Sequence, residues 1–531
     1  MSGVAGMRPQ RKAAVLVRSA GVVAAIRGLD FGLSFLVSVL LAHRFGASGQ
    51  LDAFFLARRT TVGFADMIRK LVGQVVLPPV LAAVDAGRVP TLAHLPRRLT
   101  WFLGAFALLM LAGMIVPEQL VALFAPGFRG EQVALTATMM RIMMPLLPIA
   151  VLASLLATVL QARRKYLISE GTNMVQRAVL VLVLALFVPP LGIIAGAWTM
   201  LVAGVIGFAI LLAGAWSIVR PRGGAPVEHE RPIQSAGGGL AAAIVLNVYL
   251  QGTSLLDFAF ASTTIDGGVA ALEYGSRLVS LVPGLVMSSL ATVLTPELVR
   301  AVQSSNRASV AGEIQRFQRI ALFAQVPVSV GMMLGGTLIV SVLFGHGAFG
   351  ADAIAAAAAC TAGYAAAAIF LAPMTAITTA IYADPHSSPL RDLTVIAIAG
   401  LAIRAVTLAI ATPLAGVEGV AWGAALATAL AFVVAEVIAV RRFHHFRLGA
   451  QLSDLARTLL CGGLAAAAGV GLLWLLPTPH RLYGELALLA LLGATVVAAY
   501  GLAALMLRVP EVAALRDVAN KVIGKRRGKR A

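Results

Sequence analysis

Charge is scarce in this sequence. Only 12% of the 531 residues are charged and 23 are acidic, whereas 59% are hydrophobic. Because soluble domains carry about 25% charged residues, this composition excludes an ordinary soluble fold and predicts an all-α protein that crosses a membrane many times. Cysteine is scarcer still, since Cys360 and Cys461 lie far apart inside apolar runs. That spacing excludes a disulfide framework or a cysteine-based metal cluster, and we expect no metal site.

Catalytic signatures are also missing. The sequence contains no Gly-rich phosphate loop ending in Lys-Ser/Thr, no His-Glu-x-x-His, no Gly-x-Ser-x-Gly and no Cys-x-x-Cys. Its acidic residues do not cluster in a large extramembrane loop, as a membrane glycosyltransferase would require. We therefore expect a transporter, with no catalytic residues and no bound cofactor.

What the sequence does contain is fourteen apolar segments, each long enough for a transmembrane helix at about 20 residues per crossing. They lie near residues 17–44, 52–84, 98–117, 133–161, 172–189, 192–218, 237–262, 267–300, 316–344, 351–382, 391–413, 416–440, 453–476 and 483–508. The first segment extends well past a signal-peptide core and lacks a convincing cleavage site. We expect it to remain as the first helix.

Basic residues indicate how the chain is oriented. The net charge is +19, and most of the basic residues lie in short loops and at the two ends, including the tail 521–530. With an even number of spans and both termini in the cytoplasm, the arginine-rich loops all fall on the cytoplasmic side, as the positive-inside rule requires. We expect these side chains to contact anionic lipid headgroups and not nucleic acid.

A weak internal repeat divides the chain. Leu120–Phe128 after the third predicted helix resembles Ile339–Phe349 after the ninth. Six helices separate the copies, so both would enter the membrane in the same direction, related by a pseudo-two-fold axis along the membrane normal with a central cavity between the lobes. We predict an N-lobe at 1–218, a cytoplasmic linker at 219–235, a C-lobe at 236–447, two further helices at 448–510 and a basic cytoplasmic tail at 511–531.

Several charged residues interrupt the apolar segments, although an unpaired charge at the bilayer centre costs at least ~2.5 kcal/mol. They are Arg27, Asp30, Arg58, Arg59, Asp66, Arg69, Lys70, Arg141, Arg177, Asp257, Glu273, Arg277, Arg404 and Glu436. Arginine dominates the set, and its planar fork binds pairs of phosphate oxygens, which favours an anionic, phosphorylated substrate. An alternative is that pairs such as Glu273 with Arg277, or Arg27 with Asp30, only stabilise helix packing.

Five motifs resemble the MviN/MurJ family of lipid II flippases, in the multidrug/oligosaccharidyl-lipid/polysaccharide exporter superfamily. They are Arg44–Ser48, Leu51–Phe55, Ala125–Phe128, Tyr274–Leu278 and Pro296, in that order over most of the chain. The resemblance implies a bacterial cytoplasmic-membrane protein that turns undecaprenyl-diphosphate-linked peptidoglycan precursors to the outer leaflet by alternating access. It also implies a cationic cavity for the diphosphate, and a groove at the last two helices for the lipid tail.

The resemblance also assigns substrate-binding residues. Arg277 matches an essential arginine of helix eight, and Asp52 matches the aspartate of the Asp-Ala-Phe-Phe run. Arg69, with Lys70 beside it, matches a helix-two arginine, and Arg27 matches a helix-one arginine after an insertion of about one helical turn.

Other positions depart from the family pattern. A second helix-one arginine aligns near Val37, and the acidic residue usually found before the helix-eight arginine is Ser276, so Glu273 is the candidate replacement. Asp257 aligns with an aspartate implicated in sodium coupling, but one of its expected partners is Arg404, which would act as a fixed cation or contact substrate. The driving force therefore stays open between Na⁺, H⁺ and the membrane potential.

Three alternative functions remain. A flippase for another lipid-linked oligosaccharide, such as an exopolysaccharide repeat unit, would recognise the same diphosphate and polyprenyl chain. A cation-coupled drug exporter would need an acidic, aromatic cavity, which the surplus of arginine and an aromatic content of 6% disfavour. A noncatalytic scaffold would show no transport phenotype. We expect the protein to act as a monomer on a lipid-linked oligosaccharide.

Overall fold

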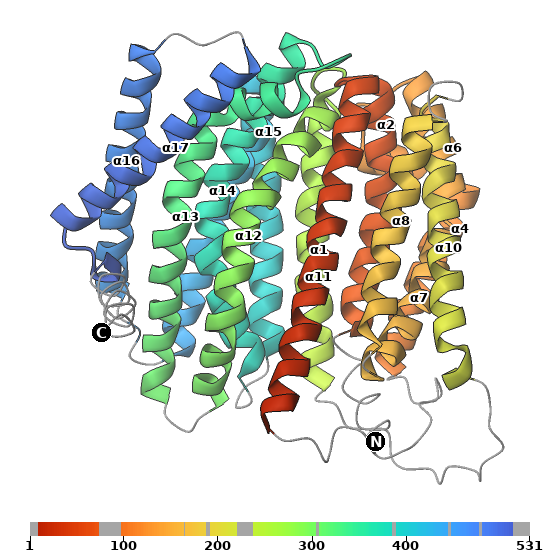
Figure 1. Ribbon diagram of the computed structural model, residues 1–531, viewed down its shortest axis with the longest axis horizontal. Helices are drawn as coiled ribbons and strands as arrows, with labels where there is room; N and C mark the ends of the chain where they lie inside the picture. The colour runs from red at the N-terminus through yellow and green to blue at the C-terminus, as the bar shows by residue number, and fades with distance from the viewer. Residues whose placement is uncertain are drawn as a thin grey trace. The chain divides into compact units, whose positions relative to one another are not determined.

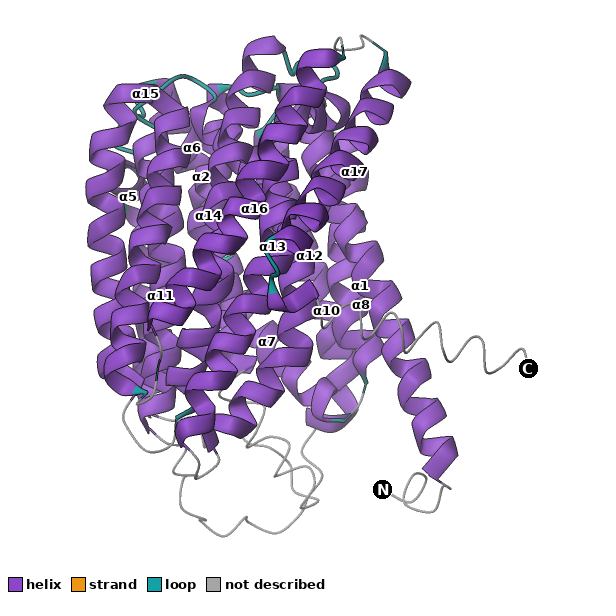
Figure 2. Cartoon of the chain, turned by 90° about the vertical axis from the view of Figure 1, so that its left-hand side faces the viewer, coloured by secondary structure: helices purple, strands orange, loops and turns teal. Residues whose placement is uncertain are grey.

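The computed structural model describes residues 9–73, 97–163, 165–186, 192–219, 237–303, 307–384, 389–443, 446, 448–476 and 481–512. Within these ranges the regular structure is entirely helical, with short connecting loops (Figure 2). A helix satisfies every interior backbone N–H and C=O within its own segment, which is what a chain needs where no water is available. The prediction of an all-α, many-spanning fold is confirmed.

The chain divides into two compact units (Figure 1). Unit one comprises Met1–Phe124 and Phe128–Leu240, and unit two comprises Ala125–Gly127 and Ala241–Ala531. The predicted linker at 219–235 lies almost wholly outside the described residues, as does the tail from residue 513 onward. The pseudo-two-fold relation of the predicted lobes stays a prediction.

In its described part, unit one is built from eight labelled α-helices, one π-helical turn and a further helical segment at 64–73. These are α1 (Pro9–Phe45), α2 (Gly49–Arg58), η1 (Arg59–Gly63), α4 (Arg97–Ile115), α5 (Pro117–Phe124), α6 (Glu131–Met143), α7 (Leu146–Ala162), α8 (Tyr166–Leu186) and α10 (Ile194–Val219). Residues 64–73 continue as helix after η1. Helix α8 packs against α1 and α10, whereas α2 packs against α6.

Unit two is built around α14. Its helices are α11 (Gly237–Ala261), α12 (Gly268–Gln303), α13 (Arg307–Phe344), α14 (Ala351–Ala383), α15 (Pro389–Arg442), α16 (Leu448–Leu475) and α17 (Leu482–Met506). Helix α14 packs against α12, α13 and α15, while α16 and α17 pack together and against α13. An apolar cluster contributes to the attachment of these last two helices, through Leu322 and Val326 of α13, Cys461 of α16, and Leu492 and Val496 of α17.

Each of the fourteen predicted segments corresponds to helix in the described residues. In the part of the chain that the structure describes, eleven helices are long and apolar enough to cross a membrane, or twelve if one bent pair forms a single span. Helix α15 holds two predicted segments, because Ala415 and Gly416 have non-helical backbone angles between them. The second predicted segment begins with α2, η1 and 64–73 and continues outside the described residues.

The third predicted segment differs from its expectation, which was a simple helix at 98–117. Helix α4 ends at Ile115, and the chain turns by 106° into α5, which begins at Pro117. Proline lacks the N–H of a helix interior and pushes the preceding residue, Val116, out of the helical region. The proline that closes the predicted span therefore produces the bend.

The Ala125–Gly127 turn is grouped with unit two because it lies against the end of α11. The backbone N–H of Gly127 donates to Oγ of Ser262, at 3.1 Å. A Cβ atom added at position 127 would lie 2.0 Å from the carbonyl oxygen of Ser262, closer than any real contact. Only glycine fits this approach, which gives a physical reason for the Ala-Pro-Gly-Phe motif.

We expect Gly127→Ala to destabilise the protein by about 1–3 kcal/mol, the usual cost of forcing a methyl group into a packed site. Thermal melting of the detergent-purified protein would measure the loss. Gly171→Ala is the matched control, because no atom lies within 4 Å of a Cβ placed there in α8. Equal melting temperatures for the two variants would contradict the packing argument.

Candidate functional site

Arg277 lies on a polar stripe of α12. Glu273, Ser276, Arg277 and Ser280 recur at the spacing of one helix face, and each is at least partly exposed. The two serine hydroxyls donate to backbone carbonyls one turn earlier, Ser276 to Glu273 at 3.0 Å and Ser280 to Arg277 at 2.7 Å. The predicted charged pair is therefore presented on an accessible face of an otherwise apolar helix.

The opposite face of the same turn anchors α12. Tyr274 is only 1% exposed, and its ring lies 4.8 Å from that of Phe344 and 5.3 Å from that of Phe349. At Gly275 a Cβ would lie 2.7 Å from Cβ of Cys360, so the glycine allows α12 to approach α14 closely. The Tyr-Gly-Ser-Arg motif thus combines two anchoring residues with two polar ones.

The predicted site residues of unit one lie in different environments. Asp52 is 2% exposed in the first turns of α2, where the positive end of the helix dipole favours a carboxylate. Arg69 and Lys70 are exposed, and Arg69 Nη1 lies 3.4 Å from Asp66 Oδ1. Arg27 belongs to α1, but its side chain lies outside the described residues.

Asp30 on α1 is held by α8. Its Oδ1 accepts a hydrogen bond of 2.5 Å from Nε of Arg177, and both side chains are partly exposed. Both residues were predicted as intramembrane charges, and Arg27 was the partner suggested for Asp30. Their pairing joins α1 to α8 inside unit one and accounts for both without a ligand.

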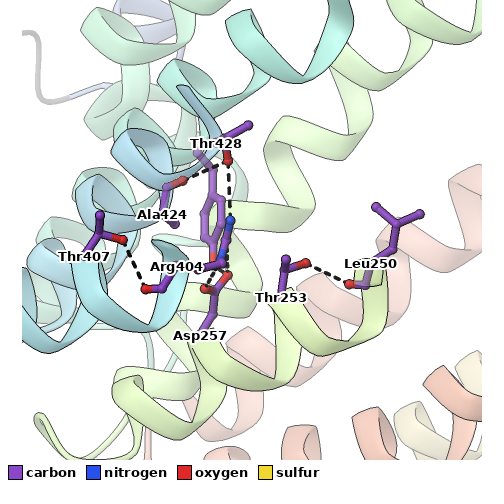
Figure 3. A network of polar contacts seen from close by, with 8 residues as sticks. Leu250, Thr253, Asp257, Arg404, Thr407, Ala424 and Thr428 are labelled. Atoms are coloured by element: carbon purple, nitrogen blue, oxygen red, sulfur yellow. Dashed lines mark hydrogen bonds and ion pairs between the residues drawn. The ribbon is translucent and has the colours of Figure 1, made fainter. Parts of the chain in front are cut away.

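Asp257 and Arg404 form a buried ion pair in unit two (Figure 3). Arg404 of α15 donates through Nε to Asp257 Oδ1 at 2.7 Å and through Nη2 to Oδ2 at 2.6 Å. Tyr364 of α14 donates its hydroxyl to Oδ2 at 2.7 Å. Both carboxylate oxygens on α11 are thus engaged, and the charge of the pair is internally neutral.

The guanidinium has further support from the second half of α15. Nη1 of Arg404 lies 3.4 Å from Oγ1 of Thr428, whose own hydroxyl donates to the carbonyl of Ala424 (Figure 3). Arg404 is 8% exposed and Asp257 is 3% exposed. Of the two roles expected for Arg404, this geometry favours the fixed cation over a contact with substrate.

The structure thus brings together two sets of predicted residues within unit two: Glu273 with Arg277 on one face of α12, and Asp257 with Arg404 between α11 and α15. Of the predicted residues in unit one, Asp52 is buried in α2 and Arg69 and Lys70 are exposed, while the side chain of Arg27 lies outside the described residues. Convergence of all these residues on one cavity stays a prediction.

Sequence reasoning missed three polar residues that complete the buried clusters. Tyr364 completes the Asp257 site, while Gln318 and Gln451 surround Glu436. An amide side chain inside an apolar span is rare enough to be a signal by itself, and it could have identified both glutamines. Nothing in the sequence distinguishes Tyr364 from a packing residue.

Replacing either partner of the Asp257–Arg404 pair should destabilise the protein by about 3–5 kcal/mol, because the remaining charge is buried without compensation. Asp257→Asn and Arg404→Met would both lower the melting temperature of the purified protein. The double variant Asp257→Asn/Arg404→Met should recover most of the loss, since it leaves no buried charge. Strictly additive losses would contradict the pairing.

Comparison with known proteins places the chain in a family. A family model described as "Lipid II flippase MurJ" matches residues 41–492. A probable lipid II flippase MurJ from Rhizobium meliloti is 28% identical over 238 residues, 43% of this chain and 44% of the relative. The lipid II flippase MurJ of Burkholderia cenocepacia is 24% identical over 340 residues, 61% of this chain and 65% of the relative. The chain therefore spans less than two thirds of either relative.

Solved structures agree on the fold. A structure described as "Lipid II flippase MurJ, inward closed conformation" has a TM-score of 0.68 at 18% identity, and the match covers 92% of this chain and 99% of that one. An inward-facing multidrug-resistance transporter of the MATE family has a TM-score of 0.56 at 12% identity, covering 78% of this chain and 94% of that one. Because the family match covers well over half of the sequence, the chain belongs to the lipid II flippase MurJ family.

Proposed function

We propose that this protein moves the diphosphate-linked peptidoglycan precursor lipid II from the inner to the outer leaflet of the cytoplasmic membrane by alternating access. The family assignment supports this proposal. The observation that carries it is the partly exposed stripe of Glu273, Ser276, Arg277 and Ser280 in the apolar helix α12. A cation kept accessible at membrane depth is costly, which marks it as a functional residue.

Arginine suits the cargo that this function requires. A diphosphate offers several anionic oxygens, and the guanidinium fork binds two of them at once with charge-assisted hydrogen bonds. Tyr274 and Gly275 fix the helical turn that carries Arg277, so the side chain meets the ligand from a preorganised backbone. Arg69 and Lys70, both exposed in unit one, would supply further positive charge from the other lobe.

The nearest alternative cargo is another lipid-linked oligosaccharide, because it shares the diphosphate and the polyprenyl chain. A drug exporter is disfavoured by the family assignment and by the arginine-rich set of buried and half-buried charges. Under this proposal both termini lie in the cytoplasm, and the basic loops contact anionic lipid headgroups. The working unit is a single chain. Transport, and not catalysis, is the proposed activity.

We further propose that sodium does not drive this transporter. In the family pattern Asp257 would face a coupling ion, but here both of its oxygens already accept hydrogen bonds from Arg404. A cation entering the site would have to displace a buried guanidinium. The membrane potential is then the simplest driving force, since the negatively charged diphosphate cargo moves out of a cell whose interior is electrically negative.

Arg277→Ala should abolish complementation of bacteria depleted of their own lipid II flippase, while membrane levels of the protein stay normal. Arg316→Ala is the matched control, because Arg316 is an exposed arginine of α13 that pairs only with acidic side chains. Full complementation by Arg277→Ala would sink the proposed site. Failure of the wild-type protein, despite good expression, would instead favour another lipid-linked oligosaccharide.

Lipid II flipping should persist when potassium replaces sodium in the medium, because the fixed guanidinium already neutralises Asp257. Flipping is measured by accessibility of the precursor at the outer surface of the depleted cells. Dissipating the membrane potential with valinomycin in the presence of potassium should, by contrast, reduce the signal strongly. A sodium requirement at constant potential would show that Arg404 does not substitute for the ion.

A further inference from the structure

Glu436 lies at the centre of a buried polar cluster that the transport proposal does not use. It belongs to the second half of α15 and is 7% exposed, while Gln318 of α13 and Gln451 of α16 are 1% and 9% exposed. The amide nitrogens of both glutamines donate to the same carboxyl oxygen, Oε1, each at 2.7 Å. Three helices therefore meet at one carboxyl group.

The glutamines are also tied to each other and to a fourth helix. Nε2 of Gln451 donates to Oε1 of Gln318, and Nε2 of Gln318 lies 3.4 Å from the carbonyl oxygen of Pro373 in α14. These contacts fix the two amide groups with their N–H sides toward Glu436. The cluster is thus oriented around one oxygen of that carboxyl.

Two oxygen atoms of the cluster are left over. Oε2 of Glu436 and Oε1 of Gln451 are both buried without a hydrogen-bond partner. In a protein interior each such acceptor costs roughly 1–3 kcal/mol. Two unsatisfied acceptors in one cluster indicate that the cluster lacks a hydrogen-bond donor.

No arginine or lysine of the described chain forms an ion pair with Glu436. The basic side chains next to the cluster are bound by other acids: Arg319 pairs with Asp454 at 3.6 Å and with Glu511 at 3.1 Å, and Arg442 pairs with Asp384 and Asp392. An ionised carboxylate in this place would lack a countercharge, which a low-dielectric interior strongly disfavours.

We propose that Glu436 is a proton-binding site within the membrane span, and that its protonated form holds α16 onto α13 and α15. The carbonyl oxygen Oε1 accepts from both glutamines, and the proton resides on Oε2. Protonation turns an unsatisfied acceptor into a donor, and Oε1 of Gln451 is the buried acceptor available in the same cluster. Release of the proton leaves the Glu436 carboxylate without a countercharge at the junction where α16 meets α13 and α15, and this weakens the attachment of α16.

A proton fits this site better than a metal ion. Hard metal cations bind about six to eight oxygen ligands, whereas only two oxygens of this cluster are without a partner. The two amide groups present their N–H sides to the carboxyl, and these would repel a metal. The position of Gln451, three residues after the start of α16 at Leu448, places the junction where that helix begins.

Infrared difference spectroscopy of the full-length protein in lipid nanodiscs tests the assignment directly. The wild type should show the carbonyl-stretch band of a protonated carboxylic acid at neutral pH and lose it as the pH rises. Glu436→Gln should lack the band at every pH. Glu485→Gln is the matched control and should retain it, because Glu485 is a partly exposed carboxylate of α17 that accepts a hydrogen bond from Ser341.

Hydrogen exchange tests the consequence for α16. Once corrected for the intrinsic rate, exchange in its first turns should rise with pH in the wild type, by up to about tenfold per pH unit for release of one proton. In Glu436→Gln, where the amide mimics the neutral acid, the corrected exchange should not depend on pH. Exchange in α17 of the wild type provides the internal reference.

Three results would overturn the proposal. One is a wild-type spectrum without a band assignable to Glu436, which would mean that the carboxyl is ionised. Another is loss of the band on adding sodium chloride in place of potassium chloride at fixed pH, which would reveal a metal site. The third is failure of Glu436→Gln to accumulate in the membrane, because the isostere of a neutral acid should fold normally.

Discussion

A low-dielectric surrounding is the constraint on which this structure depends. Where water is scarce, a buried or half-buried charge needs a partner of opposite sign, and in the two examples that follow that partner belongs to another helix. Asp257 and Arg404 join α11 to α15, while Arg177 and Asp30 join α8 to α1. Apolar side chains alone would not select these neighbours, because lipid tails are as apolar as leucine. The ion pairs therefore help to specify which helices pack together inside each unit.

The same constraint separates the arginines into two groups. Arg404 is almost fully buried and bidentate on an aspartate, so its charge is already compensated within unit two. Arg277 stays partly exposed on a stripe with Glu273 and two serines, and the anchoring of α12 is left to Tyr274 and Gly275. A residue of the first group stabilises a helix contact, and one of the second can meet a ligand. Burial, and not residue type, distinguishes them.

The transmembrane segments were predictable from the sequence, whereas the contacts between side chains of different helices were not. Runs of about 20 apolar residues can be recognised in the sequence as transmembrane helices, because only a helix can carry such a run across a bilayer. The bend at Pro117 and the break at Gly416 are local too, but neither position alone says whether the chain will turn. The partners of Asp30 and Asp257 each lie 147 residues away, so only the packed helices reveal them. For the same reason the sequence suggested Arg277 from its motif but missed Tyr364, Gln318 and Gln451.

Buried ion pairs and ligand-binding charges also differ in how they respond to a membrane potential. The Asp257–Arg404 pair carries no net charge, so moving it with unit two involves almost no electrical work. Under the proposed function, an arginine that binds the diphosphate is different, since each elementary charge that crosses the field is worth about 2.3 kcal/mol per 100 mV. Under the proposed function, a diphosphate bound to such a site makes the loaded carrier more negative, and a negative interior drives it outward. The empty site is more positive, and the same field draws it back. One potential would then favour both halves of the cycle, without a coupling ion at Asp257.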